Sequence, residues 1–277
     1  MAIPDLTPYL WAVGIAAAVL VGVSKTGVPG AGILVVPLLA RIFGGRLSVG
    51  TMLPMLIFAD CFAVAYYRRH AQWDKLWGLF PSVIVGMIAG AALLQFLGKQ
   101  PAQKDFLNIL IGALVLLMVA VHLLRQKFGD RISLRSWAAM AGVGSLAGFS
   151  TTVSNAAGPV MGVYMTSLEM PKQQFMGTTA WYFFIMNMLK FPILVGLSIA
   201  NPSNPIMSGS SLTFDLMMVP MILLGVFLGK WMLPRISQHA FDSVVLCLAA
   251  IAAVNLIHPL TPTVQPKPAA IHASVNR

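Results

Sequence analysis

The sequence predicts an all-α polytopic membrane protein built from two inverted-topology repeats of about five transmembrane or re-entrant helices each. Of its 277 residues, 58% are hydrophobic and only 9% are charged, whereas about a quarter of the residues in a soluble domain are charged. Apolar segments long enough to cross or half-cross a bilayer recur along the whole chain. A sizeable soluble domain is therefore excluded.

The apolar segments form two groups of five. In order, they cover residues 8–23, 31–43, 49–67, 76–97, 106–124, 137–149, 156–168, 175–199, 216–233 and 241–257. We accordingly divide the chain into a first membrane repeat (1–124), a basic cytoplasmic linker (125–135) and a second membrane repeat (136–258). Residues 259–277 form a polar, proline-containing tail that we expect to be disordered.

Three residue patterns recur with the same internal spacing in both groups, which supports an internal duplication. They pair Gly22, Ser24 and Thr26 with Gly148, Ser150 and Thr152, Gly50, Thr51 and Asp60 with Gly177, Thr178 and Asn187, and Pro81, Gly86 and Gly90 with Pro220, Gly225 and Gly229. Because an odd number of segments precedes the second repeat, that repeat enters the membrane in the opposite sense. This predicts inverted repeats related by a pseudo-two-fold axis in the membrane plane.

Charge predicts the orientation of the chain. The formal net charge is +10, and with the N-terminus outside the cell most basic residues fall in loops on the inner side, as the positive-inside rule requires. We therefore expect a multi-pass protein of the bacterial cytoplasmic (inner) membrane. No basic face on a folded module is present, which argues against nucleic-acid binding.

Catalytic and metal-binding patterns are absent from the sequence. The five histidines are scattered without metal-ligand spacing, and no Ser/His/Asp, HExxH or paired-carboxylate arrangement occurs. Cys61 and Cys247 lie inside apolar segments, where we expect them to pack. The sequence thus predicts a protein that is not an enzyme and needs neither a metal nor a cofactor.

Two stretches interrupt the apolar runs with small and polar residues. The first tip covers residues 22–37 (GVSKTGVPGAGILVVP) and the second tip covers 148–159 (GFSTTVSNAAGP). Irregular backbone is tolerated at membrane depth only beneath protein or beside a watery cavity. We expect Pro29 in the first turn of the following helix, whose free N–H groups and dipole attract anions. Close helix packing is the alternative role for these small residues.

The predicted anion site combines both tips with segment 175–199. Its residues are Ser24, Lys25, Thr26, Gly27, Gly30 and Gly32 in the first tip, Ser150, Thr151, Thr152, Asn155 and Gly158 in the second, and Asn187 and Lys190 on the later helix. An exposed loop position is the alternative for Lys25. Lys190 can point into the cavity or extend toward the interface.

Asp60 is the acidic residue deep inside a predicted span, and an ionisable residue there is a candidate functional group. Three roles are open to it. It can pair with Lys25, carry a proton that couples transport, or bridge helices as a protonated acid.

These motifs resemble those of the TauE/SafE sulfite exporter family of membrane permeases. The resemblance covers roughly residues 10–257 and rests on the stretch 25–37, Leu53, Pro54 and Asp60, Trp73 with Pro81, Gly86 and Gly90, and the stretch 155–159 with Gly177, Thr178 and Asn187. It implies export of sulfite or a small organosulfonate such as sulfoacetate across the cytoplasmic membrane. A passive anion channel and a membrane interaction subunit are the alternatives, and a homo-oligomer remains open.

Overall fold

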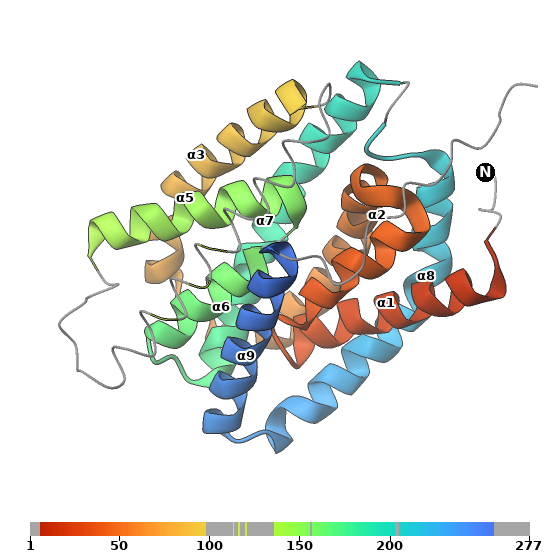
Figure 1. The fold of residues 1–277 in the computed structure, drawn as a ribbon. Coiled ribbons are helices and arrows are strands. Elements are labelled where there is room, and N and C mark those ends of the chain that lie inside the picture. The colour runs from red at the N-terminus through yellow and green to blue at the C-terminus, as the bar shows by residue number, and fades with distance from the viewer. Residues whose placement is uncertain are drawn as a thin grey trace, which may run out of the picture.

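The computed structural model describes residues 6–97, 136–155, 157–202 and 205–257, together with Ala113, Leu116 and Ala120. All regular secondary structure in these ranges is helical (Figure 1). Among the described residues, five helical segments are long and apolar enough to cross a membrane: Pro8–Thr26, Leu47–His70, Trp73–Gln95, Lys172–Ala200 and Gly209–Arg235. The prediction of an all-α polytopic membrane protein is confirmed for the described residues. The predicted linker 125–135 and tail 259–277 lie outside them, as does most of segment 106–124.

The helices follow the predicted segments closely. They are α1 (Pro8–Thr26), α2 (Val35–Tyr67), α3 (Trp73–Leu97), α5 (Trp137–Ser154), α6 (Ala157–Ser167), α7 (Lys172–Ala200), α8 (Gly209–Met232) and α9 (Gln238–Ile257), with short 3₁₀ turns η1 (Ala31–Leu34), η2 (Arg68–His70) and η3 (Leu233–Arg235). Local capping explains several of the starts. The side chains of Thr7 and Ser136 accept backbone N–H bonds at the starts of α1 and α5, and Ser208 forms a capping box at α8.

The first tip differs from its prediction in two respects. Helix α1 continues through Thr26, so the irregular backbone begins only at Gly27. Pro29 does not lie in the first turn of an α-helix, because a turn and η1 intervene before α2 begins at Val35. The predicted helix N-terminus at Pro29 is therefore wrong.

Helix α2 covers two predicted segments, 31–43 and 49–67, in one run of 33 residues. Gly32 and Met52 are about 30 Å apart along a straight helix, yet both line one cavity. The chain must therefore bend between them. The consecutive residues Gly44 and Gly45 lie in this stretch, and glycine weakens a helix. Figure 1 shows the α2 ribbon turning back on itself.

The return segments after the two tips are short. Helix α6 has 11 residues and is about 16 Å long, which is roughly half of the hydrocarbon thickness of about 30 Å. The first arm of α2, residues 35–43, is shorter still. Neither return helix crosses the hydrocarbon alone, which favours re-entrant tips over complete crossings.

Helices α1 and α8 lie side by side and approach closely through glycines (Figure 1). A Cβ atom at Gly22 would overlap backbone atoms of Ile222 and Val226 on α8. A Cβ atom at Gly225 would overlap the backbone of Val19 on α1. Only glycine permits this approach.

Helices α3 and α5 form a second pair of the same kind (Figure 1). A Cβ atom at Gly148 would overlap the backbone of Val83 and Met87, and one at Gly86 would overlap that of Ser145. Each pair thus joins a helix from one half of the chain to a helix from the other.

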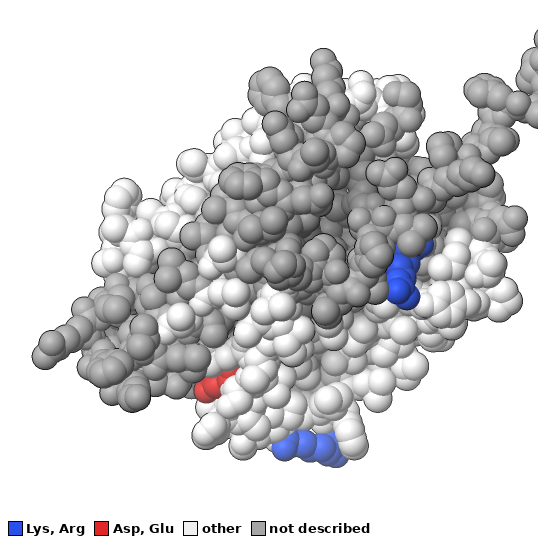
Figure 2. Space-filling view, viewed as in Figure 1, with Lys and Arg blue, Asp and Glu red and all other residues white. Residues whose placement is uncertain are grey.

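Helices α2 and α7 contact each other between these two pairs, while α6 packs against α9 (Figure 1). The outward faces of the spanning helices are apolar, and the described residues in Figure 2 include few charges. Exposed apolar side chains include Trp77, Ile84, Val85 and Ile88 on α3 and Leu216, Leu224, Phe227 and Trp231 on α8. Such faces suit contact with lipid tails. Cys61 and Cys247 are also exposed, so their predicted packing role is wrong.

The substitution Gly22→Ala is expected to destabilise the α1–α8 contact by about 1–3 kcal/mol, because the added methyl group must displace backbone. Thermal unfolding of the purified protein in detergent measures the effect. Gly142→Ala is the matched control, since a Cβ atom there meets nothing within 4 Å. Equal unfolding temperatures for Gly22→Ala and the unchanged protein would contradict the close approach.

Candidate functional site

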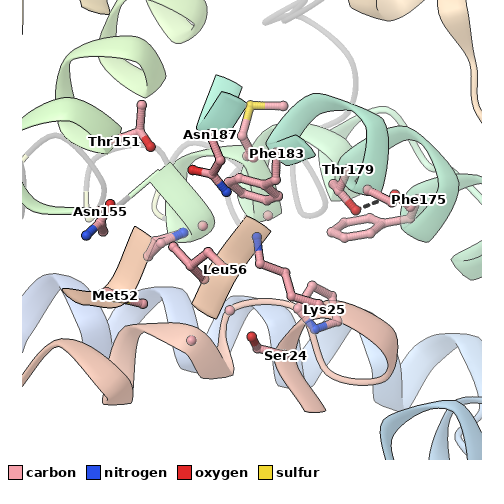
Figure 3. Close-up of a pocket in the computed structure, with 18 residues that line it drawn as sticks. Ser24, Lys25, Met52, Leu56, Thr151, Asn155, Phe175, Thr179, Phe183 and Asn187 are labelled. Carbon is pink, nitrogen blue, oxygen red and sulfur yellow. Dashed lines mark hydrogen bonds between the residues drawn. The ribbon is translucent and has the colours of Figure 1, made fainter. Parts of the chain in front are cut away.

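A cavity lies between the two tips and helices α2 and α7. The space that the centres of water molecules can occupy is about 60 Å³, and one water needs about 10–15 Å³ on this measure. Several waters or one small polyatomic anion therefore fit. Figure 3 shows Thr151 and Asn155 at one end of the cavity and Phe175 and Thr179 at the other.

Two helical stripes form opposing walls of the cavity. Met52 and Leu56 line it from α2, with Asp60 one further turn along the helix. Thr179, Phe183 and Asn187 line it from α7 at the same four-residue spacing. Residues four apart share one face of a helix. The α2 wall is thus apolar, with Asp60 just beyond it, whereas the α7 wall carries Thr179 and Asn187 beside Phe183.

Lys25 lies in the last turn of α1, and its side chain extends toward α7 (Figure 3). Its Nζ atom lies 2.8 Å from Asp60 Oδ1, with 10% of the Lys25 side chain and 0% of the Asp60 side chain exposed. The same ammonium lies 4.1 Å from the centroid of the Phe183 ring, within the range of a cation–π interaction. Lys25 is therefore not an exposed loop lysine, and Asp60 is its ionic partner.

Asn187 completes the environment of this ion pair. Its Nδ2 atom donates a hydrogen bond of 2.7 Å to Asp60 Oδ2. The bond joins the polar mid-helix residues of α2 and α7, which the sequence comparison had aligned with each other. Each Asp60 oxygen thus has one close partner among the described residues, as a buried carboxylate requires.

Lys190 is fully buried and does not reach the membrane interface. Its ammonium donates to Asn155 Oδ1 over 2.5 Å and to the Thr151 carbonyl oxygen over 3.1 Å. A cation near the last carbonyls of α5 stabilises the C-terminal end of that helix. Lys190 therefore lies behind the second tip and does not line the cavity itself.

Asn155 ends α5 in the left-handed conformation, with φ 55°, which asparagine tolerates better than most residues. Its Oδ1 atom faces the Lys190 ammonium, which has no acceptor, so the amide orientation is determined. Its Nδ2 atom donates 3.1 Å to the Val49 carbonyl oxygen on α2. Asn155 thereby fixes the second tip to a helix of the first half.

The predicted site residues divide into two groups. Those that line the cavity are Ser24, Lys25, Gly30, Gly32, Thr151, Asn155, Gly158 and Asn187. The others are Thr26, Gly27, Ser150, Thr152 and Lys190, and they lie outside its lining. The two tips predicted from the sequence therefore lie at the cavity. Five of the thirteen predicted binding residues, however, do not line it, and several of these contact neighbouring helices.

Packing explains the positions of several residues outside the lining. Thr26 donates to the Val226 carbonyl oxygen on α8, and Gly27 lies against the backbone of Gly229. Thr152 contacts Gly90 on α3. These contacts correspond to the alternative of close helix packing, and they hold the tips in place.

The sequence prediction missed several lining residues, most of them apolar. Met52, Leu56, Phe175, Thr179 and Phe183 all contact the cavity. A signal was available, because Thr179 and Phe183 precede Asn187 at intervals of four residues on one helix face. The same spacing continues to Phe175 on that helix, and Met52 and Leu56 precede Asp60 in the same way. It does not by itself mark a cavity, because apolar residues on a spanning helix show the same pattern whether they face lipid, protein or a cavity.

The groups around the cavity are of the kind that suit an anion. Hydrogen-bond donors and an ammonium group line the cavity. No group of three or more His, Cys, Asp or Glu residues that could hold a metal occurs in the part of the chain that the structure describes.

Comparison with known proteins gives one match. A family model described as "Sulfite exporter TauE/SafE" matches residues 13–256. No curated protein and no solved structure matches the chain. The matched region includes both tips and every residue that lines the cavity.

Replacing Lys25 alone by Met is expected to lower the free energy of unfolding by about 3–5 kcal/mol, because it leaves the Asp60 carboxylate buried without its counter-ion. The double variant Lys25→Met with Asp60→Leu should recover much of that loss, since it removes both charges. Thermal unfolding in detergent compares the variants. A double variant less stable than Lys25→Met alone would contradict a direct pairing of the two side chains.

Proposed function

The chain belongs to the TauE/SafE sulfite exporter family, and from this premise we propose that it is a secondary transporter of a small oxyanion. Membership implies an anion exporter of the membrane and not an enzyme. The cargo we propose is sulfite or an organosulfonate such as sulfoacetate, and the membrane is the bacterial cytoplasmic membrane. Asp60 is the proposed proton-coupling residue.

The observation that carries the proposal is the balance of charge around the cavity. Lys25 lines the cavity, and Lys190 binds the lining residue Asn155. Asp60 is the carboxylate that the structure describes beside them. With all three groups ionised, one positive charge is left without a counter-ion inside the membrane. A low effective dielectric strengthens its attraction for an anion.

Three polar side chains can supply directed hydrogen bonds to that anion. Asn155 and Asn187 each use one amide hydrogen on a protein acceptor, and an amide nitrogen carries two. Thr151 Oγ1 accepts a 3.4 Å bond from Lys190, so its own hydroxyl hydrogen can be donated. Several donors around one space suit the oxygens of a sulfite or sulfonate group.

Inverted repeats are part of the proposal, and matched contacts support them. Gly22 and Gly148 are aligned in sequence, and they meet equivalent positions on α8 and α3. Gly50 and Gly177, aligned likewise, meet the carbonyl oxygens of Ile206 and Tyr67. Two related halves around one site are typical of transporters in which one bundle moves against the other, opening the site to each side in turn.

The contacts at one end of the bundle support the proposed orientation. Lys172 Nζ donates to the Leu233 carbonyl oxygen beside Arg235. Gln72, next to η2 and its arginines, donates its backbone N–H to Thr178 near the start of α7. Basic residues from distant parts of the chain thus gather at one end, which the positive-inside rule assigns to the cytoplasm.

Transport should fall when a single cavity group is removed. Lys25→Met and Asn155→Ala are each expected to lower kcat/KM for anion flux about tenfold or more, because a hydrogen bond to a charged group contributes about 1.5–3 kcal/mol. Flux into vesicles containing the purified protein is measured with sulfite, sulfoacetate, sulfate and thiosulfate. Lys75→Met is the control, since Lys75 is exposed and pairs with the exposed Asp74.

Other outcomes would favour the alternative functions. Flux that does not saturate and ignores an imposed pH gradient would indicate a passive channel. Absence of both flux and binding for all four anions would indicate a membrane interaction subunit. Unchanged flux in both cavity variants would refute the proposed site.

A further inference from the structure

The Asp60 carboxylate is fully buried just outside the cavity lining. Its two close partners are Lys25, 2.8 Å from Oδ1, and Asn187, 2.7 Å from Oδ2. Both partners line the cavity. An anion that enters the cavity therefore meets the two groups that hold Asp60 without meeting Asp60 itself.

The Lys25 ammonium is the group for which the anion and Asp60 compete. It lies between the Asp60 carboxylate and the Phe183 ring, 4.1 Å from the ring centroid. The Lys25 ammonium thus already has an anionic partner, the side chain of Asp60. A second anion that binds the ammonium closely must weaken or replace this ion pair.

The other charged and titratable groups near Asp60 do not replace Lys25 as its partner. Lys190 lies one turn after Asn187 on α7, and its ammonium is bound to oxygens of Thr151 and Asn155. Cys61 follows Asp60 on α2 and is exposed on the outer surface. The Lys190 charge attracts Asp60 from a distance, but Lys25 makes the direct contact.

From this arrangement we infer that the anion and one proton bind together, an inference that rests on the proposed transport function. The anion binds the Lys25 ammonium in place of Asp60, and a carboxylate oxygen of Asp60 is protonated by a proton from water. Lys25 keeps its charge throughout. When the anion leaves, Asp60 releases the proton to water and pairs with Lys25 again.

The physical reason is the cost of a buried carboxylate without a counter-ion. Once Lys25 turns to the anion, Asp60 keeps a single amide hydrogen bond inside the membrane, and taking up a proton removes its charge. A singly charged anion and a proton together leave the charge of the site unchanged. Net flux then follows the sum of the anion and proton gradients, and the membrane potential does not drive this loading step.

Calorimetric titration of the purified protein with methanesulfonate tests the inference. This probe stays singly charged between about pH 5 and 9, so it neither takes up nor releases protons itself. Titrations in two buffers with different ionisation enthalpies report the protons exchanged. We expect one proton to be taken up per anion bound. The loaded state holds one proton more than the free protein. The Kd for methanesulfonate should therefore rise about tenfold per pH unit over the range in which Asp60 is ionised in the free protein and protonated in the loaded protein.

Two variants assign the proton to its residue. Asp60→Asn should bind methanesulfonate with no proton uptake and with a Kd that does not change with pH. Asp215→Asn is the matched control. Asp215 is buried in α8 with neither carboxylate oxygen hydrogen-bonded to a described residue, and it does not line the cavity. Proton uptake should therefore persist in this variant.

The results separate this inference from the proposed function. Binding of methanesulfonate by the unchanged protein without proton uptake would overturn the coupling and leave anion transport standing, because the Lys190 charge would then suffice to keep Asp60 ionised. Uptake that persists in Asp60→Asn would assign the proton elsewhere and would also overturn the inference. Absence of binding and of vesicle flux for every anion tested would overturn both proposals.

Discussion

The ion pair between Lys25 and Asp60 is the interaction on which the centre of this protein depends. Each charge alone would be costly inside a membrane, so the two must be brought together and kept there. Lys25 ends α1, Asp60 lies in the second arm of α2, and Asn187 on α7 binds the carboxylate. Three helices from both halves of the chain must therefore meet at one point.

The glycine contacts on either side make this meeting possible. Gly22 and Gly225 let α1 approach α8 at backbone distance, and Gly86 and Gly148 do the same for α3 and α5. Each contact positions the helix that carries one tip. The polar tips are thus held by apolar, close-packed helices, and their polar atoms bind groups on neighbouring helices or face the cavity. The four glycines thus serve helix packing. The cavity lies where α1 and α5 end.

The two tips contribute different chemistry. The first supplies the Lys25 ammonium at the cavity wall, whereas the second supplies the hydroxyl of Thr151 and the amide of Asn155. Lys190 binds the second tip and does not line the cavity, and its ammonium orients Asn155. Apolar side chains such as Met52 and Phe183 close the remaining walls. The cavity therefore combines one charged side, one neutral polar side and an apolar lining.

The sequence by itself determined the all-α membrane class, the position of most helices and the two tips, because apolar length and glycine-rich interruptions are local properties. It also identified Lys25, Asp60, Asn155 and Asn187 as unusual, since polar groups are rare inside spanning segments. Only the tertiary structure decided which of them meet. The bend in α2, the burial of Lys190 and the cavity face of Phe183 depend on contacts between distant segments, and no local pattern distinguishes a side chain facing lipid from one facing a cavity.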